Sequence, residues 1–282
     1  MRILIVGASS SLAQALIPIL SQFAQVFRAG RADGDIHLDL SDELDPRQLP
    51  PGIDVLVNAA ASFGGTDPSA VYVTEQVNAL GTLKLCQLCT AASIPHMLQV
   101  SSIFASLDAA SPFYTAYSLS KRHADELAQL YCKNAGLALT IIKPSQFYGV
   151  GQAYRQHQPF LFSIIDKVAN NEDVAIYGRR DARRNFIHVE DVAHLIALAI
   201  QRRLTGSYAC AHPQDVSYSD IFRAAALAFH SSSQLHFVPQ QPDIADNVFP
   251  ADDRLFRLLG YTPRISFAAG MAREAAHRKG KQ

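Results

Sequence analysis

The stretch Arg2-Ile-Leu-Ile-Val-Gly-Ala-Ser-Ser-Ser-Leu-Ala13 decides the fold of this chain. Its apolar run Arg2–Val6 predicts a buried strand, and Leu12–Phe23 follows with apolar residues at helical spacing. Gly7 permits a tight turn, after which the first amides of the helix, at its positive dipole end, suit a phosphate. Gly7, Ser10 and Ala13 occupy the three positions that a dinucleotide-binding loop fills with small residues. Ser10 replaces the usual glycine: its side chain either crowds a pyrophosphate or bonds to it, and the alternative is an ordinary helix N-cap.

The alternation of short apolar runs with helical patterns continues through the first half of the chain. Continuous apolar strands between helices are typical of a parallel sheet covered on both faces. We therefore predict an α/β fold, a Rossmann-type doubly wound parallel sheet that binds its ligands at the carboxyl ends of the strands. Further strands are expected at Gln25–Ala29, Asp54–Asn58, His96–Ser101 and Leu139–Ile142, and helices at Ser69–Ala92 and Tyr117–Asn134.

The pattern changes near residue 150, where the polar stretch Gly151–His157 follows the last predicted strand. We predict a dinucleotide-binding domain over residues 1–150, to which residues 184–212 return. Residues 151–183 and 213–282 are expected to form a smaller α/β C-terminal substrate lobe. Its basic tail beyond Ala275 is expected to fray. Helices are predicted at Pro159–Ala169, Val189–Gln201 and Tyr218–Phe229, with a short strand at Val174–Tyr177.

Composition and charge exclude several classes of protein. The 282 residues carry 25 basic and 25 acidic side chains, so no charge excess indicates nucleic acid or a membrane surface as a partner. No apolar run approaches the roughly 20 residues of a membrane span, and no signal peptide is recognisable. Four scattered cysteines form no disulfide scaffold, and Cys86 and Cys89 lie within a predicted helix as core residues. We expect a cytoplasmic protein with no metal site.

The end of the second predicted strand bears on the choice of cofactor. A carboxylate there accepts hydrogen bonds from the adenosine ribose, whereas a cation binds a 2′-phosphate. The chain has Arg28 and Arg31 at this place and no acid before Asp33. This favours NADP(H), with Arg31 better placed than Arg28, over NAD(H), which remains possible; the alternative is a solvated basic loop. Asp39 in Leu38-Asp39-Leu40 is placed to accept from the adenine amino group, or else caps a turn.

Tyr117 and Lys121 stand four residues apart and share one face of a predicted helix. A neighbouring ammonium favours tyrosinate and lowers the pKa of a tyrosine from its usual value of about 10. Ser101 and Ser102 end a strand at the same edge of the sheet, where a hydroxyl can bond to a substrate carbonyl or alcohol. The combination predicts proton transfer beside a bound dinucleotide.

These segments together resemble the extended short-chain dehydrogenases/reductases, the NAD(P)-dependent nucleotide-sugar epimerase/dehydratase/reductase family. The resemblance implies that Ser102, Tyr117 and Lys121 are the catalytic residues, with Ser102 preferred to Ser101 on its spacing to Ser106. Other matching segments are Asn58-Ala-Ala-Ala61, Val77–Thr82 with its central Asn78, Lys143-Pro-Ser-Gln-Phe-Tyr-Gly149, Arg184–Val192 and Leu258–Pro263.

The resemblance also implies the binding residues and the partners. Arg184, within a basic cluster of Arg179, Arg180, Arg183 and Arg184, would contact a substrate diphosphate. A nucleotide sugar is the implied substrate, and a homodimer would pair helices such as Ser69–Ala92 and Tyr117–Asn134. The implied substrate residues are Phe104, Gln146 and Arg184. The implied cofactor residues are Gly7, Ser9, Ser10, Ser11, Leu12, Arg28, Arg31, Asp39, Leu40, Ala59, Ala60, Ala61, Asn78, Tyr117, Lys121, Pro144 and Phe147.

Departures from the family pattern narrow the expected reaction. Ile103-Phe104 stands where the family's dehydratases carry an Asp-Glu pair, which argues against a dehydratase. We expect NADPH-dependent reduction of a keto group on a nucleotide-linked sugar, with Tyr117 as the proton donor. The alternative is an NAD-dependent nucleotide-sugar epimerase. A second alternative is a non-catalytic dinucleotide-binding sensor or assembly subunit, against which the intact set of three residues argues.

Overall fold

A computed structural model describes residues 1–32 and 34–280 of the chain. The chain forms two compact units: the first contains Met1–Pro144, Val192–Cys210 and Arg254–Tyr261, and the second contains Ser145–Asp191, Ala211–Asp253 and Thr262–Gln282. Four segments differ from the expected division. Residues 145–150, 184–191 and 211–212 belong to the second unit. Arg254–Tyr261 belongs to the first, because its helix packs against a strand of the first sheet.

The first unit is built on a sheet of seven parallel strands in the order β11-β6-β5-β4-β1-β2-β3. Because all the strands run in one direction, their carboxyl ends lie along one edge, where Gly7, Ala59 and Ser101 follow β1, β4 and β5. The strands are β1 (Arg2–Val6), β2 (Gln25–Gly30), β3 (Ile36–His37), β4 (Val55–Asn58), β5 (His96–Val100), β6 (Ala138–Pro144) and β11 (Gly206–Cys210).

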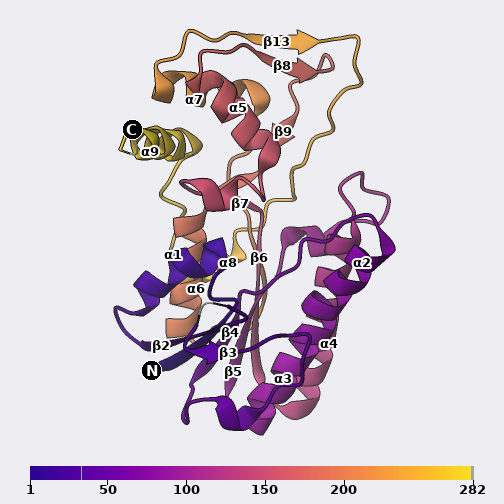
Figure 1. Ribbon diagram of the computed structural model, residues 1–282, viewed down its shortest axis with the longest axis vertical. Helices are drawn as coiled ribbons and strands as arrows, with labels where there is room; N and C mark the ends of the chain where they lie inside the picture. The colour runs from indigo at the N-terminus through magenta and orange to yellow at the C-terminus, as the bar shows by residue number, and fades with distance from the viewer. Residues whose placement is uncertain (33, 281–282) are drawn as a thin grey trace. The chain divides into compact units, whose positions relative to one another are not determined.

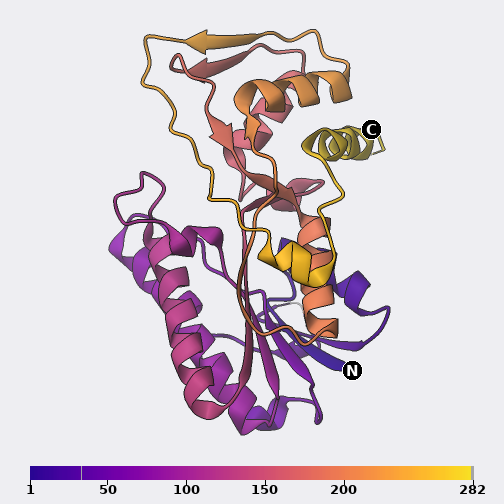
Figure 2. The ribbon, with the colours of Figure 1, turned by 180° about the vertical axis from the view of Figure 1, so that it is seen from behind.

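Helices cover both faces of this sheet (Figures 1 and 2), as the predicted doubly wound fold requires. The helices α2 (Pro68–Glu75), α3 (Gly81–Ala91) and α4 (Ala116–Ala135) lie on one face. On the other face lie α1 (Ser11–Leu20), α8 (Arg254–Leu259) and the part of α6 (Val189–Gln201) that belongs to this unit. The long helix α4 begins at a capping box of Thr115 and Ser118 and ends at Gly136, whose φ of 65° is left-handed.

The segment predicted as one helix over Ser69–Ala92 has a wider turn in its middle. The helices α2 and α3 are joined by a π-helical turn, η2 (Gln76–Leu80). The amide of Asn78 in this turn donates to Ser62 O and to the Ser120 hydroxyl. Apolar periodicity does not reveal such a turn, because its cause is a set of polar contacts with distant segments.

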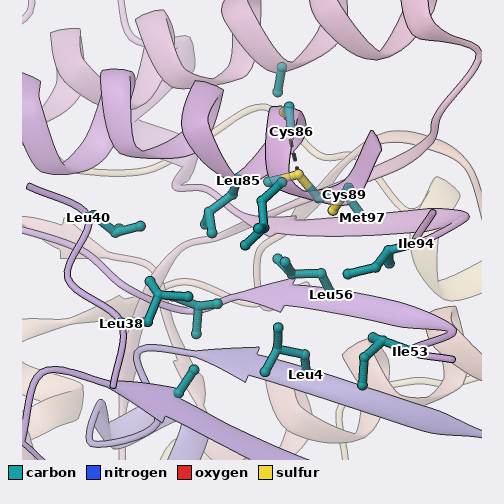
Figure 3. Close-up of a cluster of buried hydrophobic side chains, with 14 of the residues drawn as sticks. Leu4, Leu38, Leu40, Ile53, Leu56, Leu85, Cys86, Cys89, Ile94 and Met97 are labelled. Carbon is teal, nitrogen blue, oxygen red and sulfur yellow. Dashed lines mark hydrogen bonds between the residues drawn. The ribbon is translucent and has the colours of Figure 1, made fainter. Parts of the chain in front are cut away.

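The core of the first unit lies between α3 and the strands (Figure 3). Cys86 and Cys89 are buried there, as predicted, and Cys132 is buried in the same cluster. Burial raises the pKa of the Cys89 thiol, so this side chain stays a neutral apolar group. The residues drawn include Leu4, Leu38, Leu40, Ile53, Leu56, Leu85, Ile94 and Met97.

The second unit contains three two-stranded sheets and three helices. The strand pairs are β7 (Gln146–Tyr148) with β10 (Phe186–His188), β9 (Arg183–Arg184) with β12 (Val216–Ser217), and β8 (Val174–Tyr177) with β13 (Leu235–Val238). The helices are α5 (Pro159–Ala169), α7 (Tyr218–Phe229) and α9 (Phe267–Lys279).

The basic end of α9 corrects the expectation that the tail frays beyond Ala275. The helix continues to Lys279 because Arg278 pairs with Glu274 one turn earlier and with Asp166 of α5, at 2.8 and 2.9 Å. Cations in the last turn of a helix also interact favourably with its dipole. Residues 281–282 lie outside the described part of the chain.

Within residues 1–32 and 34–280, none of the helices has both the length and the apolar character to cross a bilayer. In the same residues, no three His, Cys, Asp or Glu side chains are grouped so that they could bind a metal ion.

Candidate active site

In the turn between β1 and α1, the backbone at Gly7 passes close to the backbone of Ala60. Gly7 has a φ of 80°, and a Cβ atom there would lie 2.5 Å from Ala60 N and 2.6 Å from Ala60 Cα. The first turn of α1 contains no acidic residue. A glycine cradle that opens a helix without nearby carboxylates fits the phosphates of a dinucleotide. Ser9, Ser11 and Leu12 lie in the same turn, Ser9 exposed and the other two buried.

Ser10 is the N-cap of α1. Its Oγ accepts a hydrogen bond from Ala13 N at 3.2 Å, so the N-cap interpretation of this serine is confirmed. A hydroxyl both accepts and donates, and this cap uses one acceptor position. The Ser10 hydrogen can therefore still be given to a phosphate oxygen, and the cap does not exclude a binding role.

The two arginines considered for cofactor choice are in different situations. Arg28 is paired with Asp35, with Nη2 3.0 Å from Oδ1, and its backbone amide donates to the same carboxylate. This pairing holds the pKa of Asp35 below its usual value and occupies the Arg28 guanidinium. Arg31 is exposed, and its charge contributes to the lowered pKa of Asp39. Asp33, named above as the first acid, lies outside the described residues.

Asp39 and Leu40 form a fixed corner after β3. Asp39 Oδ1 accepts from Ser41 N at 2.8 Å, a hydrogen bond that is the main cause of the lowered pKa of Asp39. Lys84 of α3 donates to the carbonyl oxygens of Leu40, Ser41 and Asp42 at 2.9–3.1 Å. The turn-capping alternative for Asp39 is thus observed.

A buried amide network supports the strip Ala59–Ala61 after β4. Asn58 accepts from Ala60 N at 3.1 Å and donates to Gln99 and Thr82. Beyond the strip, Asn78 accepts from Ser62 N and donates to Ser62 O, at 2.8 and 2.7 Å. The third bond of Asn78, to Ser120, uses its second amide hydrogen. Both side-chain amide hydrogens of Asn78, a residue expected to bind the cofactor, are therefore used within the protein, where they hold the segment after the strip.

Ser102, Tyr117 and Lys121 come together at the carboxyl end of β5. Ser102 and Tyr117 are hydrogen bonded, which lowers the pKa of the tyrosine, but burial has the larger effect and raises it to about 12. The buried Lys121 donates from Nζ to Val100 O at 3.0 Å. Burial lowers the pKa of this ammonium to about 8, and the nearby carboxylate of Asp125 opposes the shift. Burial thus shifts both pKa values in the direction that favours the uncharged side chain.

The two adjacent serines have different partners. Ser101 Oγ donates to Asp125 Oδ2 at 2.9 Å, behind Lys121. Ser102 bonds to Tyr117 and also accepts from Phe104 N at 3.3 Å, at the start of the short turn η3 (Ile103–Ser106). Strand residues alternate in direction, so adjacent serines at a strand end point different ways. This geometry supports the choice of Ser102 over Ser101.

The sequence reasoning missed one aromatic contact with Tyr117. Phe63 stacks on the Tyr117 ring with centroids 5.2 Å apart and an interplanar angle of 17°, although 51% of Phe63 is exposed. Its signal was its place two residues after the small-residue strip that ends at Ala61. An aromatic side chain there shields the phenol of Tyr117 from water.

The remaining expected residues of the first unit lie at the same strand ends. Pro144 is the last residue of β6 and is buried. Phe104 is half-buried in η3, where its amide donates to Ser102. Gln146, Phe147 and Arg184 belong to the second unit.

Within the second unit, Arg184 lies against an aromatic pair. Its Nε donates to the Tyr218 hydroxyl at 2.8 Å, and the guanidinium carbon lies 5.4 Å from the centroid of the same ring. Phe160 contacts Tyr218 edge-on at 5.1 Å. Gln146 donates to Gln158 and accepts from Asn247, so its amide is part of a local network. Phe147 is a half-buried residue of β7.

The expected basic cluster is largely neutralised by aspartates. Arg180 pairs with Asp246 at 3.1 Å, and Arg183 lies 3.7 Å from Asp215. Asp243 accepts from the backbone amides of Arg179 and Arg180. Aspartates brought close by the fold thus use part of the charge of this cluster, and Arg184 lies on an aromatic face.

Comparisons with known proteins agree with this geometry. The NAD dependent epimerase/dehydratase family matches residues 3–210. A dTDP-4-dehydro-6-deoxy-D-allose reductase of Streptomyces bikiniensis is 23% identical over 81% of this chain and 77% of its own length. A CDP-abequose synthase of Salmonella typhimurium is 23% identical over 77% of this chain and 73% of its own.

Solved structures share the fold over nearly the whole chain. The Thermus thermophilus UDP-glucose 4-epimerase in complex with NAD superposes with a TM-score of 0.78 at 19% identity, covering 100% of both chains. A UDP-N-acetylglucosamine 4-epimerase of Methanobrevibacter ruminantium gives 0.82 at 17% identity, covering 100% of this chain and 99% of the other.

Proposed function

The chain belongs to the NAD dependent epimerase/dehydratase family of extended short-chain dehydrogenases/reductases, and from this premise we propose that it reduces a keto group of a nucleotide-linked sugar with NADPH. The observation that carries the proposal is the group of Ser102, Tyr117 and Lys121 at the carboxyl end of β5, in which Ser102 and Lys121 are buried and Tyr117 is half-buried. Two relatives named as a keto-sugar reductase and a sugar-nucleotide synthase support the reductive direction.

The cofactor would be held by the glycine cradle and the strip opposite it. Gly7 and the start of α1 would take the pyrophosphate, with Ser10 donating its free hydrogen. Lys121 would bond to the nicotinamide ribose and Asp39 to the adenine amino group. NADPH, when bound, supplies the hydride.

Three side chains would orient the carbonyl oxygen of the substrate and supply its proton. Ser102 would donate a hydrogen bond to the carbonyl oxygen and orient it for attack on its carbon. Tyr117 keeps its proton at neutral pH, because burial raises its pKa to about 12, and it would give this proton to the oxygen as an alkoxide forms. The Lys121 ammonium would stabilise the tyrosinate left behind.

The preference for NADPH rests on Arg31. Its guanidinium is exposed beyond β2, whereas Arg28 is held by Asp35. An arginine fork suits a 2′-phosphate, and a plain ribose would gain nothing from it. Arg184 on its aromatic face would contact the diphosphate of the substrate.

The homodimer is proposed from the exposed face of the α2–α4 layer. Four large apolar side chains are exposed on α2, η2 and α4, between 47% and 69%. Exposed apolar side chains gathered on one helical layer are typical of a protein interface. Light scattering during gel filtration would give twice the chain mass of 30.8 kDa if the proposal holds. These side chains are Tyr72, Val73, Leu80 and Leu130.

The function is tested by cofactor titration followed by turnover. Calorimetric titration of nucleotide-free protein should show tighter binding of NADPH than of NADH. With a panel of nucleotide-linked keto sugars, Tyr117→Phe should abolish NADPH oxidation, whereas Tyr131→Phe on the same helix should not. Tightly retained NAD together with interconversion of two sugar epimers would replace the reductase with the epimerase. Full activity of Tyr117→Phe would refute the proposed mechanism.

A further inference from the structure

A buried carboxylate lies behind the proposed catalytic lysine. Asp125 stands one helical turn after Lys121 on α4, as Lys121 stands one turn after Tyr117, so the three side chains follow one face of the helix. Only 3% of Asp125 is exposed and 2% of Lys121. Within the described residues, Asp125 Oδ1 is buried and makes no hydrogen bond. A buried carboxylate of this kind is costly in free energy unless it interacts with nearby cations.

Two donors hold the other carboxylate oxygen. Ser101 donates to Asp125 Oδ2 at 2.9 Å, and Lys143 Nζ of β6 lies 3.0 Å from the same atom. Lys143 is itself within 3.4 Å of the Ser106 hydroxyl. The carboxylate is therefore fixed in position by β5 and β6 and shared between two lysines, one at the site and one behind it.

We propose that Asp125 is a positioning residue for the reaction: with Ser101 and Lys143 it keeps Lys121 in its ammonium form inside an apolar site. This proposal rests on the proposed function in one respect: the reaction uses the Lys121 ammonium. Lys121 has one neutral acceptor, Val100 O, which cannot by itself offset the loss of water around a buried charge. The nearby carboxylate supplies the missing compensation.

The charges around Lys121 come from few elements. Its own helix contributes Tyr117 and Asp125, and β6 contributes Lys143. Two further polar groups of α4 have partners elsewhere: Arg122 donates to Ala105 O, and His123 Nδ1 lies 3.1 Å from a carboxylate oxygen of Glu75 in α2. Within residues 1–32 and 34–280, Asp125 is thus the anion that compensates the charge of Lys121.

The direct test is titration of Lys121 in the protein without cofactor. The chain has seven lysines, so lysine labelled with carbon-13 at Cε gives a small set of NMR signals, and the Lys121 signal is the one absent from Lys121→Met. In Asp125→Asn the Lys121 midpoint should fall by about one pH unit or more, the usual effect of an opposite charge at short range. Glu126→Gln, which removes an exposed carboxylate one residue away, should leave it unchanged.

A second variant should move the midpoint in the opposite direction. Lys143→Met leaves the whole carboxylate to Lys121 and removes a cation, so the Lys121 midpoint should rise. It also keeps the proposal testable if Asp125→Asn does not fold. An unchanged midpoint in Asp125→Asn, or a fall in Lys143→Met, would overturn the proposal.

The functional consequence is measured by NADPH affinity as a function of pH. As the pH rises, NADPH affinity should be lost about one pH unit lower in Asp125→Asn than in the wild type. In Asp125→Glu it should be lost at the wild-type pH. Absence of NADPH binding by the wild type would refute the proposed function but not the role of Asp125, because the NMR titration needs neither cofactor nor sugar. Identical pH profiles in wild type and Asp125→Asn would refute the role of Asp125 while leaving the reductase intact.

Discussion

Replacing Gly7 by alanine tests the close approach that shapes the phosphate turn. Gly7 has a φ of 80°, and the added Cβ would lie 2.5 Å from the backbone nitrogen of Ala60. A left-handed alanine costs roughly 1–2 kcal/mol, and crowding a packed site costs typically about 1–3 kcal/mol more. Because the crowded atoms are backbone, they cannot rotate away. We expect Gly7→Ala to lower the free energy of unfolding by about 2–5 kcal/mol.

Gly136→Ala is the matched control for this substitution. Gly136 has a φ of 65°, but a Cβ there would meet nothing within 4 Å. It should therefore show the conformational cost alone, about 1–2 kcal/mol. Unfolding in urea is followed by far-UV circular dichroism, since the chain has no tryptophan. If both variants lose the same stability, the turn does not approach Ala60 as described, and the reasoning for the phosphate cradle fails with it.

Three further predictions concern the cofactor, acid stability and a buried contact. Arg31→Ala should weaken NADPH binding about tenfold or more in calorimetric titration, as expected for a lost charged hydrogen bond, with NADH affinity unchanged; equal losses for both cofactors would exclude Arg31 as the 2′-phosphate ligand. Burial lowers the pKa of His96, which is bonded to Thr140, so the unfolded state binds its proton more readily. The stability that neutral His96 contributes is complete above its unfolded pKa of about 6.5 and is lost as pH falls below it. His96→Gln should therefore reduce the change in the urea midpoint of unfolding between pH 7.5 and 5. A Cβ at Gly270 would fall against the Tyr148 hydroxyl, which has no hydrogen-bond partner within residues 1–32 and 34–280. Gly270→Ala should destabilise the protein. Tyr148→Phe removes the hydroxyl but keeps the ring carbons that lie 2.7 Å from the added Cβ, so it should rescue part of the loss in a double-mutant cycle of thermal unfolding; additive effects would contradict the contact.

Local patterns predicted the elements that depend on near neighbours. The strand Arg2–Val6 and the helices Pro159–Ala169 and Tyr218–Phe229 lie where the apolar spacing places them. Each begins or ends at a local signal, such as the proline that opens α5 or the serine that caps α7. The parallel sheet followed from the same patterns, because apolar runs between helices leave few other arrangements.

The features that depend on distant contacts were not predictable in this way. The π turn around Asn78 follows from bonds to Ser62 and Ser120, and no spacing rule contains them. The pairing of Arg28 with Asp35 and the aspartates on the arginine cluster also come from the fold. In the candidate site, Tyr117 and Lys121 share a helix and could be paired from sequence. The role of Asp125 required the strand that brings Lys143 to it.

The division of the chain into interleaved segments limits how this protein can be re-engineered or can diversify. Each unit is assembled from three separate stretches, so the chain passes from one to the other at five junctions. A fragment ending at Pro144 would lack β11, and its strand β6 would become an unpaired edge prone to aggregation. Neither unit can therefore be exchanged by a single recombination event. If the second unit binds the substrate, as the proposed contact of Arg184 requires, a new substrate preference is acquired by point changes and loop insertions within that unit, while the first is retained.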